Sequence, residues 1–183
     1  MLDTASGSKS AIGSGFYVHP RYLLTNYHVV SELVFRPEQY SLEIVHDDGR
    51  TEPVELANID VVHDLALLRA ARPAGDALQL SGDVLSKGSR VYAFGNPYDL
   101  GASIIEGTYN GLLEDSLYEK IHFSGALNPG MSGGPAIARD GRVVGVNVST
   151  AGNEVSFLVP AKFAIELLAQ TLQRGPRPDT KFV

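Results

Sequence analysis

One serine in this sequence has the surroundings that a nucleophilic hydroxyl needs. Ser132 lies in the stretch 128–135, with Gly130 two residues before it and Gly133 and Gly134 directly after it. Glycines on both sides allow a sharp turn and a close approach of another molecule to the backbone. In such a turn, backbone N–H groups can stabilise the charge on the atom that the nucleophile attacks. A surface turn that happens to contain a serine is the alternative, so partners elsewhere in the chain must decide.

The base that activates a serine near neutral pH is usually an imidazole that is held by a carboxylate. All histidines of the chain precede the serine, and they are His19, His28, His46, His63 and His122. His28 ends an apolar run and begins a predicted helical turn, where its ring can face inward. His19 and His46 border turns and are expected to be solvated. The residue pattern leaves His63 and His122 open as alternatives.

The order of these residues excludes one class of serine enzyme. Residues 130–134 also match the G-x-S-x-G turn of α/β-hydrolases, in which the histidine follows the serine and the turn leads into a helix. Here no histidine follows Ser132, and Pro135 opens a segment with strand and hairpin patterns. The order that remains is histidine, aspartate, serine, as in chymotrypsin.

The aspartate of such a group orients the histidine and stabilises its charged form, so it must be drawn partly out of water. Asp64 directly precedes the apolar run 65–68 and lies between His28 and Ser132 in the chain. It is therefore the best placed carboxylate, and a cap or a surface residue is the alternative reading. Weaker candidates are the turn formers Asp47 and Asp48, and also Asp60 and Asp76.

Composition narrows the remaining classes of function. A chain of 183 residues is long enough for one ordinary domain, or for two small packed halves with a core. A formal net charge of -6 argues against nucleic acid or an anionic membrane as the main partner. The absence of cysteine removes disulfides, thiolate catalysis and cysteine-bound zinc.

The chain contains no stretch close to the ~20 apolar residues of a membrane span, so no membrane insertion is expected. Residues 1–15 are small and polar and lack the apolar run of a secretory signal. If Met1 is the native start, we therefore predict a cytoplasmic location. If Met1 was added for expression, the compartment is open.

Short strand patterns separated by turn residues fill most of the chain. The predicted strands cover residues 11–18, 22–25, 41–46, 51–59, 65–68, 90–94, 104–113, 118–123, 135–138, 142–148 and 154–159. Hairpin signals are present at Asp47-Asp48-Gly49 and Asp140-Gly141. Residues 1–10 are predicted to be a flexible lead-in, and residues 26–33 a helical turn. Only residues 160–173 have the apolar spacing of a full helix, so the pattern predicts an all-β barrel or sandwich with one terminal helix.

Three stretches together resemble the trypsin-like serine proteases, and most closely the bacterial HtrA branch. Residues 25–30 resemble the histidine motif of that family, residues 64–68 its aspartate motif, and residues 130–135 its serine motif. Secondary signatures and the last strand of the family are matched by residues 13–16, 95–97 and 155–160. The resemblance covers nearly the whole chain, from about Ala11 to Gln173.

The resemblance implies a single peptidase domain over residues 1–183, built from two six-stranded antiparallel β-barrels. These occupy about 11–80 and 89–159, with the loop-rich stretch 71–88 between them, and a helix follows at 160–173. It also implies a serine endopeptidase that hydrolyses peptide bonds of a protein or peptide substrate through an acyl-enzyme. No metal or organic cofactor is expected.

The roles of individual residues follow from the same resemblance. Ser132 would be the nucleophile, His28 the base and Asp64 the residue that orients it, while the N–H groups of Gly130 and Ser132 would form the oxyanion hole. One departure is Met131, because HtrA enzymes usually carry asparagine there and pancreatic enzymes aspartate. Activation by an ion pair with the N-terminus is therefore not expected. No PDZ domain follows the helix, so a regulatory domain would be a fusion partner or a separate protein.

The substrate pocket that the resemblance implies lies between the segment before the serine and a later strand. Its residues would be Ala126 and Leu127, after Gly125, together with Asn147, Val148 and Ser149. None of them is acidic, so a preference for arginine or lysine is not expected. We predict a small or medium apolar side chain in this pocket, with a polar preference helped by Asn147 or Ser149 as the alternative.

Two other readings of the sequence are weighed against the protease. A protease fold that binds peptides or partner proteins without cleaving them is the main alternative, because an intact triad does not ensure an assembled oxyanion hole. Metal binding through His46-Asp47-Asp48 or His63-Asp64 is the weaker one, since two adjacent ligands rarely make a site.

Overall fold

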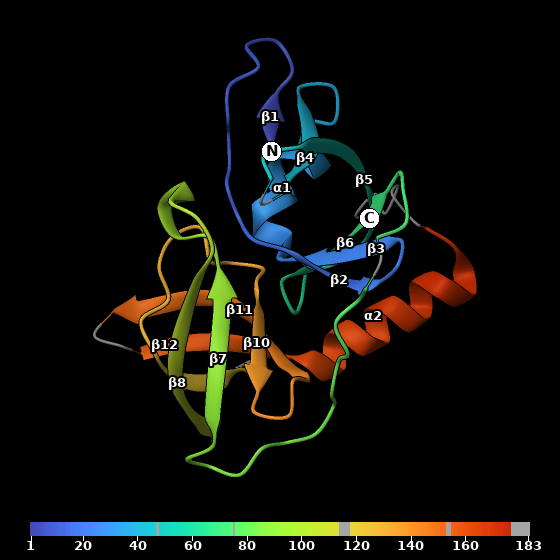
Figure 1. The fold of residues 1–183 in the computed structure, drawn as a ribbon. Coiled ribbons are helices and arrows are strands. Elements are labelled where there is room, and N and C mark those ends of the chain that lie inside the picture. Colours follow the sequence, from blue (N-terminus) through green and yellow to red (C-terminus); the bar gives the residue numbers. More distant parts are fainter. Residues whose placement is uncertain (47, 75, 114–117, 153–154, 177–183) are drawn as a thin grey trace.

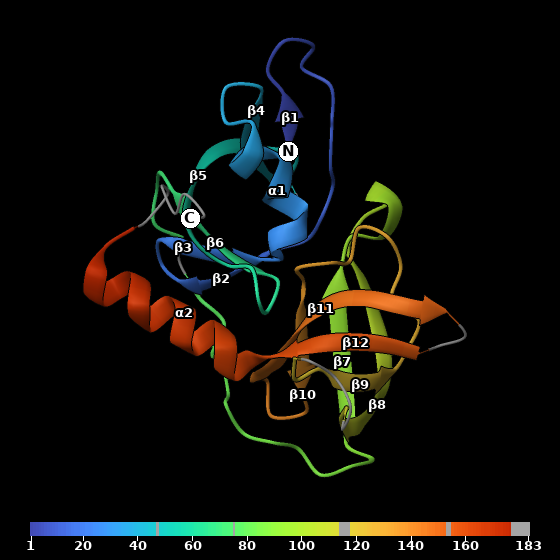
Figure 2. The same ribbon diagram turned by 180° about the vertical axis from the view of Figure 1, so that it is seen from behind.

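In the part of the chain that the structure describes, two six-stranded antiparallel sheets stand side by side, with one helix beside the first and one across both (Figures 1 and 2). The structure is a computed structural model that describes residues 1–46, 48–74, 76–113, 118–152 and 155–176, and for 149–152 the backbone alone. The prediction of an all-β fold with a C-terminal helix is therefore confirmed. The predicted turn residue Asp47 lies outside the described residues.

The N-terminal sheet has the strand order β1-β4-β5-β6-β3-β2. Its strands are β1 (Leu2–Asp3), β2 (Phe16–His19), β3 (Tyr22–Thr25), β4 (Tyr40–Val45), β5 (Thr51–Asp60) and β6 (Leu65–Ala70). The apolar run that predicts a buried strand is β6, in which every side chain except that of Arg69 is buried. Helix α1 (Tyr27–Phe35) follows β3 and packs against β4 and β6.

Closure by strand pairing distinguishes the two sheets. The N-terminal sheet has β1 and β2 at its two edges, whereas the C-terminal sheet is a closed barrel in the order β10-β11-β12-β9-β8-β7. The barrel strands are β7 (Arg90–Gly95), β8 (Ser103–Leu112), β9 (Ile121–Ser124), β10 (Pro135–Ala138), β11 (Val143–Gly152) and β12 (Val155–Pro160). The pairing of β10 with β7 closes it. The N-terminal sheet is not closed by strand pairing. Its edge strand β1 has 2 residues, and β4 is the strand with which it pairs.

The lead-in is more ordered than its small polar residues predict. Leu2 pairs with Ser41, and the Asp3 carboxylate accepts the N–H groups of Ala5 and Ser6 at 3.0 and 2.9 Å. An aspartate that accepts from the backbone two or three residues later forms a turn of its own. The prediction of a flexible segment over residues 1–10 is wrong for this reason.

Helix α2 (Ala161–Arg174) leaves the barrel at β12 and runs along the N-terminal sheet (Figures 1 and 2). One hydrophobic cluster contains side chains of both sheets and of the helix, among them Leu24, Leu67, Val146, Val159 and Leu167. A buried hydrogen bond adds to this apolar contact: the Asn58 amide of β5 donates to the Thr171 hydroxyl of α2 at 2.9 Å. The helix therefore fixes one sheet against the other.

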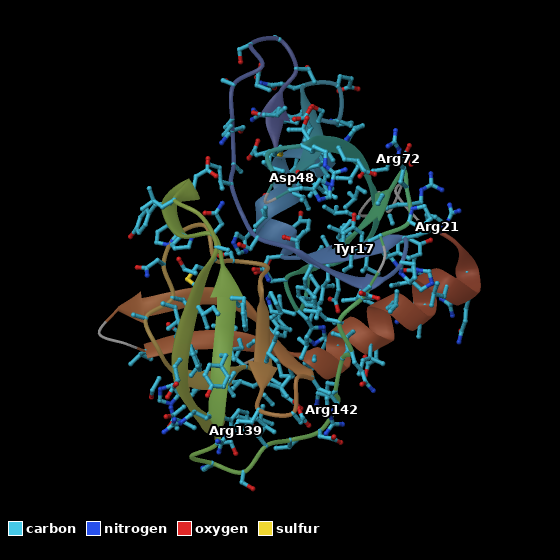
Figure 3. The ribbon with its side chains drawn as sticks, in the orientation of Figure 1. Tyr17, Arg21, Asp48, Arg72, Arg139 and Arg142 are labelled. Atoms are coloured by element: carbon cyan, nitrogen blue, oxygen red, sulfur yellow. The ribbon has the colours of Figure 1, made fainter. Side chains whose placement is uncertain are left out.

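The connection between the two sheets contacts the barrel at β11 and at the hairpin that precedes it. Residues 71–89 join β6 to β7, and within them Leu80 bridges to Val143. Arg142, labelled in Figure 3, contacts Asp83 of this connection at 3.0 Å and Asp140 of its own hairpin at 2.8 Å. These pairs are exposed and lie at the lower end of the barrel, so they contribute little to stability.

We expect Thr171→Val to lower the free energy of unfolding by about 1–3 kcal/mol, because the buried Asn58 amide loses its acceptor. Thr171→Ser keeps the hydroxyl and is the matched control, with an expected loss below ~1 kcal/mol. Urea unfolding of both variants measures the difference. Equal stability of the two variants would show that the hydrogen bond does not hold α2 in place.

Candidate active site

The residues singled out by the sequence come from three separate segments. His28 lies in the first turn of α1, Asp64 directly precedes β6, and Ser132 lies in the loop between β9 and β10. A hydrogen bond between backbone groups joins the two halves here: the N–H of Ser14 donates to the carbonyl of Ser132 at 2.7 Å. The N-terminal sheet supplies the first two groups, and the barrel supplies the serine.

A paired contact joins His28 to Asp64. The Nδ1 atom of His28 lies 2.7 Å from Oδ2 of Asp64, and the backbone N–H of His28 donates to Oδ1 at 2.8 Å. Both carboxylate oxygens therefore contact the same residue, which fixes the ring relative to its own backbone. With Nδ1 turned to the carboxylate, Nε2 is the ring atom that is left for a further partner.

Asp64 also takes the place of a helix cap. Asn26 is the N-cap residue of α1, yet its side chain makes no capping bond to the helix. Instead the Asp64 carbonyl accepts the Tyr27 N–H at 3.1 Å and the Asn26 amide at 2.9 Å, while its carboxylate accepts the next N–H, that of His28. The first N–H groups of a helix lack partners within the helix. Asp64 therefore starts α1 and orients His28 with the same contacts.

The backbone of Asp64 makes this double role geometrically feasible. Its φ is 56°, in the left-handed region that non-glycine residues enter rarely and aspartate more often than most. Burial raises the pKa of the neighbouring Tyr27 phenol, and the negative charge of Asp64 adds to that rise. The sequence alone gave no sign of the unusual backbone conformation.

Exposure is where the site differs from expectation. The His28 side chain is 48% exposed and that of Asp64 is 26% exposed. The ring therefore does not face inward, and the carboxylate is screened from water without lying in the core. Both residues lie at the ends of their elements, where helix α1 and strand β6 begin, and solvent reaches them.

Ser132 directs its hydroxyl to a carbonyl of the barrel. Its Oγ donates to the Val148 carbonyl at 2.7 Å. Ser132 and His28 both lie in the described part of the chain, and no hydrogen bond joins them. Val148 falls at an irregularity of β11, where the register with β12 shifts between Asn147 and Ser149. A residue at a bulge is left out of the regular ladder, so its carbonyl is free to accept the serine.

The backbone before the serine forms a tight turn. The Met131 N–H donates to the Asn128 carbonyl at 3.0 Å, with Pro129 and Gly130 between them. Gly130 has a φ of 97°, and proline followed by such a glycine is the signature of a type II turn. A Cβ at Gly130 would also lie 2.4 Å from the Asn96 carbonyl oxygen. Only glycine fits here.

The peptide group between Pro129 and Gly130 is held from one side. The Pro129 carbonyl accepts the N–H of Tyr98 at 2.9 Å. Tyr98 belongs to the short 3-10 helix η1 (Pro97–Asp99) that follows β7. The described peptides are trans, and a trans peptide directs its N–H opposite to its C=O. The N–H of Gly130 therefore points away from Tyr98.

The peptide group between Met131 and Ser132 is held in the same way. The Met131 carbonyl accepts the Gly134 N–H at 3.1 Å and the Asn147 side-chain amide at 3.3 Å. The N–H of Ser132 therefore points away from both. Among the described residues, neither Gly130 nor Ser132 has an acceptor for its N–H. Two backbone donors are thus left beside the serine hydroxyl.

Met131 lies entirely within the barrel core. It is 0% exposed and packs among the buried residues of the C-terminal sheet. A Cβ on the facing Gly95 would lie 2.8 Å from its Cα atom. An apolar side chain thus occupies the position directly before the serine, and it stabilises the turn by packing.

The residues predicted to line a substrate pocket differ in accessibility. Ala126 is exposed and Val148 is half-buried, whereas Leu127 is buried among the barrel core residues. Asn147 is 0% exposed, and its amide group also donates to the Phe94 carbonyl at 2.8 Å. Its Oδ1 atom has no partner among the described residues. Asn147 thus positions backbone rather than facing solvent.

Ser149 is described by its backbone alone, in the ladder opposite Phe157 of β12. Ser156 of the same strand was not singled out by the sequence, yet its buried hydroxyl organises the segment before the serine. It donates to the Gly125 carbonyl at 2.6 Å and accepts the Leu127 N–H at 3.2 Å. The role of these residues toward a substrate stays a prediction.

Three of the other histidines, His19, His46 and His63, contact groups outside this site. His63 pairs with Asp60 at 2.6 Å, and its ring stacks on Phe163 of α2 with 3.6 Å between centroids. His19 accepts the Arg21 N–H at 3.1 Å, and His46 lies 3.6 Å from a Glu52 oxygen. His122 lies on β9. Of the described histidines, His28 is therefore the one whose ring and backbone N–H are both held by Asp64.

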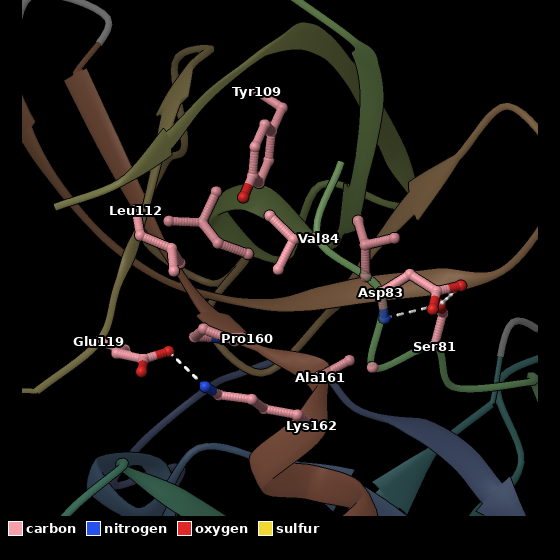
Figure 4. A pocket seen from close by; sticks show the side chains of 12 residues that line it. Ser81, Asp83, Val84, Tyr109, Leu112, Glu119, Pro160, Ala161 and Lys162 are labelled. Atoms are coloured by element: carbon pink, nitrogen blue, oxygen red, sulfur yellow. Dashed lines mark hydrogen bonds and ion pairs between the residues drawn. The ribbon is translucent and has the colours of Figure 1, made fainter. Parts of the chain in front are cut away.

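A hollow lies at another part of the barrel (Figure 4). It is bounded by the connection at Ser81, by Tyr109 and Leu112 of β8, and by the beginning of α2, where Lys162 pairs with Glu119 at 2.5 Å. None of the three residues singled out for chemistry borders it. Within the described part of the chain, no group of three or more His, Asp or Glu side chains is arranged to hold a metal ion. Neither described α-helix is long and apolar enough to cross a membrane.

We expect Asp64→Ala to destabilise the protein by about 1–2 kcal/mol, because α1 loses the acceptor of its first turn. Asp64→Asn retains a side-chain oxygen for the His28 N–H and tolerates the left-handed backbone, so it should lose less than half of that amount. His28→Ala is the control that removes the ring and keeps the cap. Chemical unfolding of the three variants measures the difference, and a similar loss in all three would contradict the capping role.

Comparison with known proteins shows what this fold and site belong to. A family model described as the trypsin-like peptidase domain matches residues 13–146. A probable periplasmic serine endoprotease DegP-like of Marinomonas sp. is 32% identical, over 92% of this chain and 37% of that protein. The serine protease HTRA1 of Xenopus laevis is 28% identical, over 90% of this chain and 37% of that protein. The chain thus spans little more than a third of the length of these curated relatives.

Solved structures agree with this. The HtrA-type protease AlgW with a decapeptide superposes with a TM-score of 0.78 at 27% identity, over 90% of this chain and 52% of that one. The serine endoprotease from Yersinia pestis has a TM-score of 0.79 at 23% identity, over 93% of this chain and 61% of that one, which supports the fold alone. With a family model that matches most of its length, this chain belongs to the trypsin-like peptidase domain family and resembles the HtrA proteases within it.

Proposed function

We propose that this chain is a serine endopeptidase that cleaves peptide bonds through an acyl-enzyme. Ser132 Oγ attacks the substrate carbonyl while His28 Nε2 takes its proton, and the resulting tetrahedral oxyanion collapses with loss of the amine, which receives that proton. A water molecule then repeats the sequence on the ester and restores Ser132. Asp64 keeps the ring in the tautomer that leaves Nε2 free, and no metal or organic cofactor takes part.

The contact that carries this proposal is the 2.7 Å pairing of His28 Nδ1 with Asp64, reinforced by the 2.8 Å bond to the His28 N–H. A carboxylate that holds one ring nitrogen of a histidine in this way stabilises the imidazolium that forms during proton transfer. The pair comes from elements that the N-terminal sheet fixes, whereas the serine comes from the barrel. Such a division suits a cleft between two halves.

Two N–H groups for which the described residues provide no acceptor support an oxyanion hole at Gly130 and Ser132. Each belongs to a peptide whose carbonyl is bound on the other side, by Tyr98 or by Gly134 and Asn147. Donors that are fixed before the reaction need not reorganise as charge develops, and one of them is worth about 2.7–4 kcal/mol in the transition state.

The Ser132 hydroxyl bonds to a carbonyl rather than to His28. It donates to the Val148 carbonyl, so the hydroxyl must turn away from that carbonyl before it can donate to His28. Catalytic hydrogen bonds that are absent in a free enzyme often form only with substrate bound. We propose that substrate binding brings this rotation about.

The same contact favours a second candidate function. A serine whose hydroxyl is held by a carbonyl would make the chain a protease fold that binds peptides or partner proteins without cleaving them. AlgW binds a peptide in its solved structure, and the same is a proposal for this chain. Binding of peptides without any covalent labelling of the serine would identify this alternative.

For the substrate itself we keep the predicted preference for a small or medium apolar side chain, with protein or peptide as the substrate class. Buried Leu127 and exposed Ala126 are compatible with an apolar pocket, since neither carries charge. The alternative, a polar preference helped by Asn147 or Ser149, also stays a prediction; the Asn147 amide N–H groups donate to two carbonyls, and its Oδ1 has no partner among the described residues. A cytoplasmic location and a regulatory partner also stay predictions.

Reaction with a fluorophosphonate probe tests the proposed chemistry. We expect wild-type protein to be labelled on Ser132 and to cleave casein, and we expect Ser132→Ala to do neither. Ser81→Ala, which truncates a buried hydroxyl of the connection, is the matched control and should behave as wild type. Labelling of the Ser132→Ala variant, or a wild-type protein that reacts with no probe and cleaves no protein, would overturn the assignment.

Asp64→Asn separates chemistry from folding at the same site. It should lower kcat/KM by about 10⁴-fold, because an amide stabilises the wrong tautomer of the ring and cannot stabilise its positive charge. Its stability should stay close to that of wild type, as argued above for the helix start. Steady-state kinetics on a fluorogenic peptide measure the effect, and a loss below about 10-fold would remove Asp64 from the triad.

A further inference from the structure

A single hydroxyl of the N-terminal half bonds to the turn before the serine. Ser14 Oγ donates to the carbonyl of Gly130 at 2.7 Å and accepts the N–H of Asn96 at 2.9 Å. The Ser14 side chain thus joins three segments that are far apart in sequence, at residues 14, 96 and 130. Its backbone N–H adds the 2.7 Å bond to the Ser132 carbonyl.

Both ends of this hydroxyl bridge lead to the proposed oxyanion hole. Gly130 carries one of its two N–H donors. Asn96 begins the η1 segment, whose Tyr98 N–H holds the Pro129 carbonyl and so directs the Gly130 N–H. One side chain therefore connects the turn itself with the element that orients it.

The η1 segment is held in a conformation that it would not adopt by itself. Tyr98 and Asp99 both lie in the left-handed region, with φ of 54° and 59°. Two consecutive non-glycine residues there are costly, by about 1–3 kcal/mol each, and persist only where surrounding contacts fix them. Those contacts include the bond of the Asn96 N–H to Ser14, the bond of the Tyr98 N–H to Pro129 and, on the exposed side, the pair of Lys9 with Asp99. The Asn96 side chain adds bonds to Asp99 and to the Gly101 N–H within the segment.

We infer that Ser14 is a positioning residue for catalysis, whose hydroxyl fixes the oxyanion hole without touching the substrate. The inference rests on the proposed function, since it concerns the donors of that same site. Without the hydroxyl, the Gly130 carbonyl and the Asn96 N–H both lose their partner, and the turn and η1 are free to move apart. The hydroxyl must act as donor and acceptor together, which serine and threonine can do and alanine cannot.

The defect should appear in the transition state rather than in substrate binding. An oxyanion hole stabilises charge that exists only during the reaction, so its loss lowers kcat and leaves KM nearly unchanged. Removing a donor outright costs about 10²–10³-fold, and loosening both donors costs a part of this. We expect Ser14→Ala to lower kcat by about 10- to 100-fold, with KM within about 3-fold of wild type.

A series of variants at this position provides the test. Full-length Ser14→Thr, Ser14→Cys and Ser14→Ala are compared with wild type, with Ser81→Ala as a matched loss of a buried hydroxyl outside the site. The measurements are kcat and KM on a fluorogenic peptide, thermal unfolding, and affinity for a peptide aldehyde and the corresponding peptide alcohol. The aldehyde forms a tetrahedral adduct with the serine, and the alcohol only occupies the cleft.

The expected order of kcat follows donor strength, with threonine near wild type and cysteine and alanine low, because a thiol is a weak donor. The aldehyde should bind the alanine variant about 10- to 100-fold more weakly, while affinity for the alcohol stays the same. Cysteine fills the space of serine, so it tests the hydroxyl even if alanine unfolds the turn.

Three results would overturn the inference. They are wild-type kcat in Ser14→Ala and Ser14→Cys, an equal loss of affinity for aldehyde and alcohol, and a threonine variant as impaired as alanine with an unchanged unfolding temperature. In each of these cases wild-type protein still cleaves the peptide, so the proposed function stands. A wild-type protein without activity or labelling would overturn both.

Discussion

The turn that carries Ser132 lies outside the strands, so most of its carbonyl groups bond to partners from other parts of the molecule. The Pro129 carbonyl is bound by η1, the Gly130 carbonyl by Ser14, and the Met131 carbonyl by Asn147 and Gly134. Buried backbone groups without partners are costly. Once all carbonyls are satisfied from behind, the N–H groups that remain are those on the open side, beside the serine hydroxyl.

At the part of the site that the N-terminal sheet supplies, one residue also makes several contacts. Asp64 satisfies the first turn of α1 and holds the His28 ring, so the helix and the histidine are placed by one residue. Helix α2 then fixes the two sheets against each other through the cluster around Leu167 and the Asn58–Thr171 bond. The placement of His28 and Asp64 relative to Ser132 thus depends on the packing of α2 against both sheets.

Local patterns predicted the elements where local forces decide them. Residues 22–25 and 135–138 form β3 and β10 within the predicted bounds, because alternation or continuous burial is a property of the segment itself. Residues 11–18 were predicted as one strand, yet only Phe16–His19 pair in a ladder. The N–H of the preceding Ser14 donates to the Ser132 carbonyl instead. The two residues are 118 positions apart, so no local pattern could predict this contact. The helical turn after Asn26 became the nine-residue helix α1 because Asp64 caps it from outside.

The sequence by itself predicted three residues for one site, through the order His28, Asp64, Ser132 and through glycines that a tight turn requires, and the structure shows the contact between His28 and Asp64. It also determined the all-β class, since the spacing of apolar and turn residues follows the strand period. The tertiary structure decided the orientation of each group, namely the left-handed backbone of Asp64, the serine hydroxyl that donates to the Val148 carbonyl, and the two N–H donors that have no acceptor within the described part of the chain. Orientation depends on hydrogen bonds between distant segments, and their partners exist only once the chain has folded.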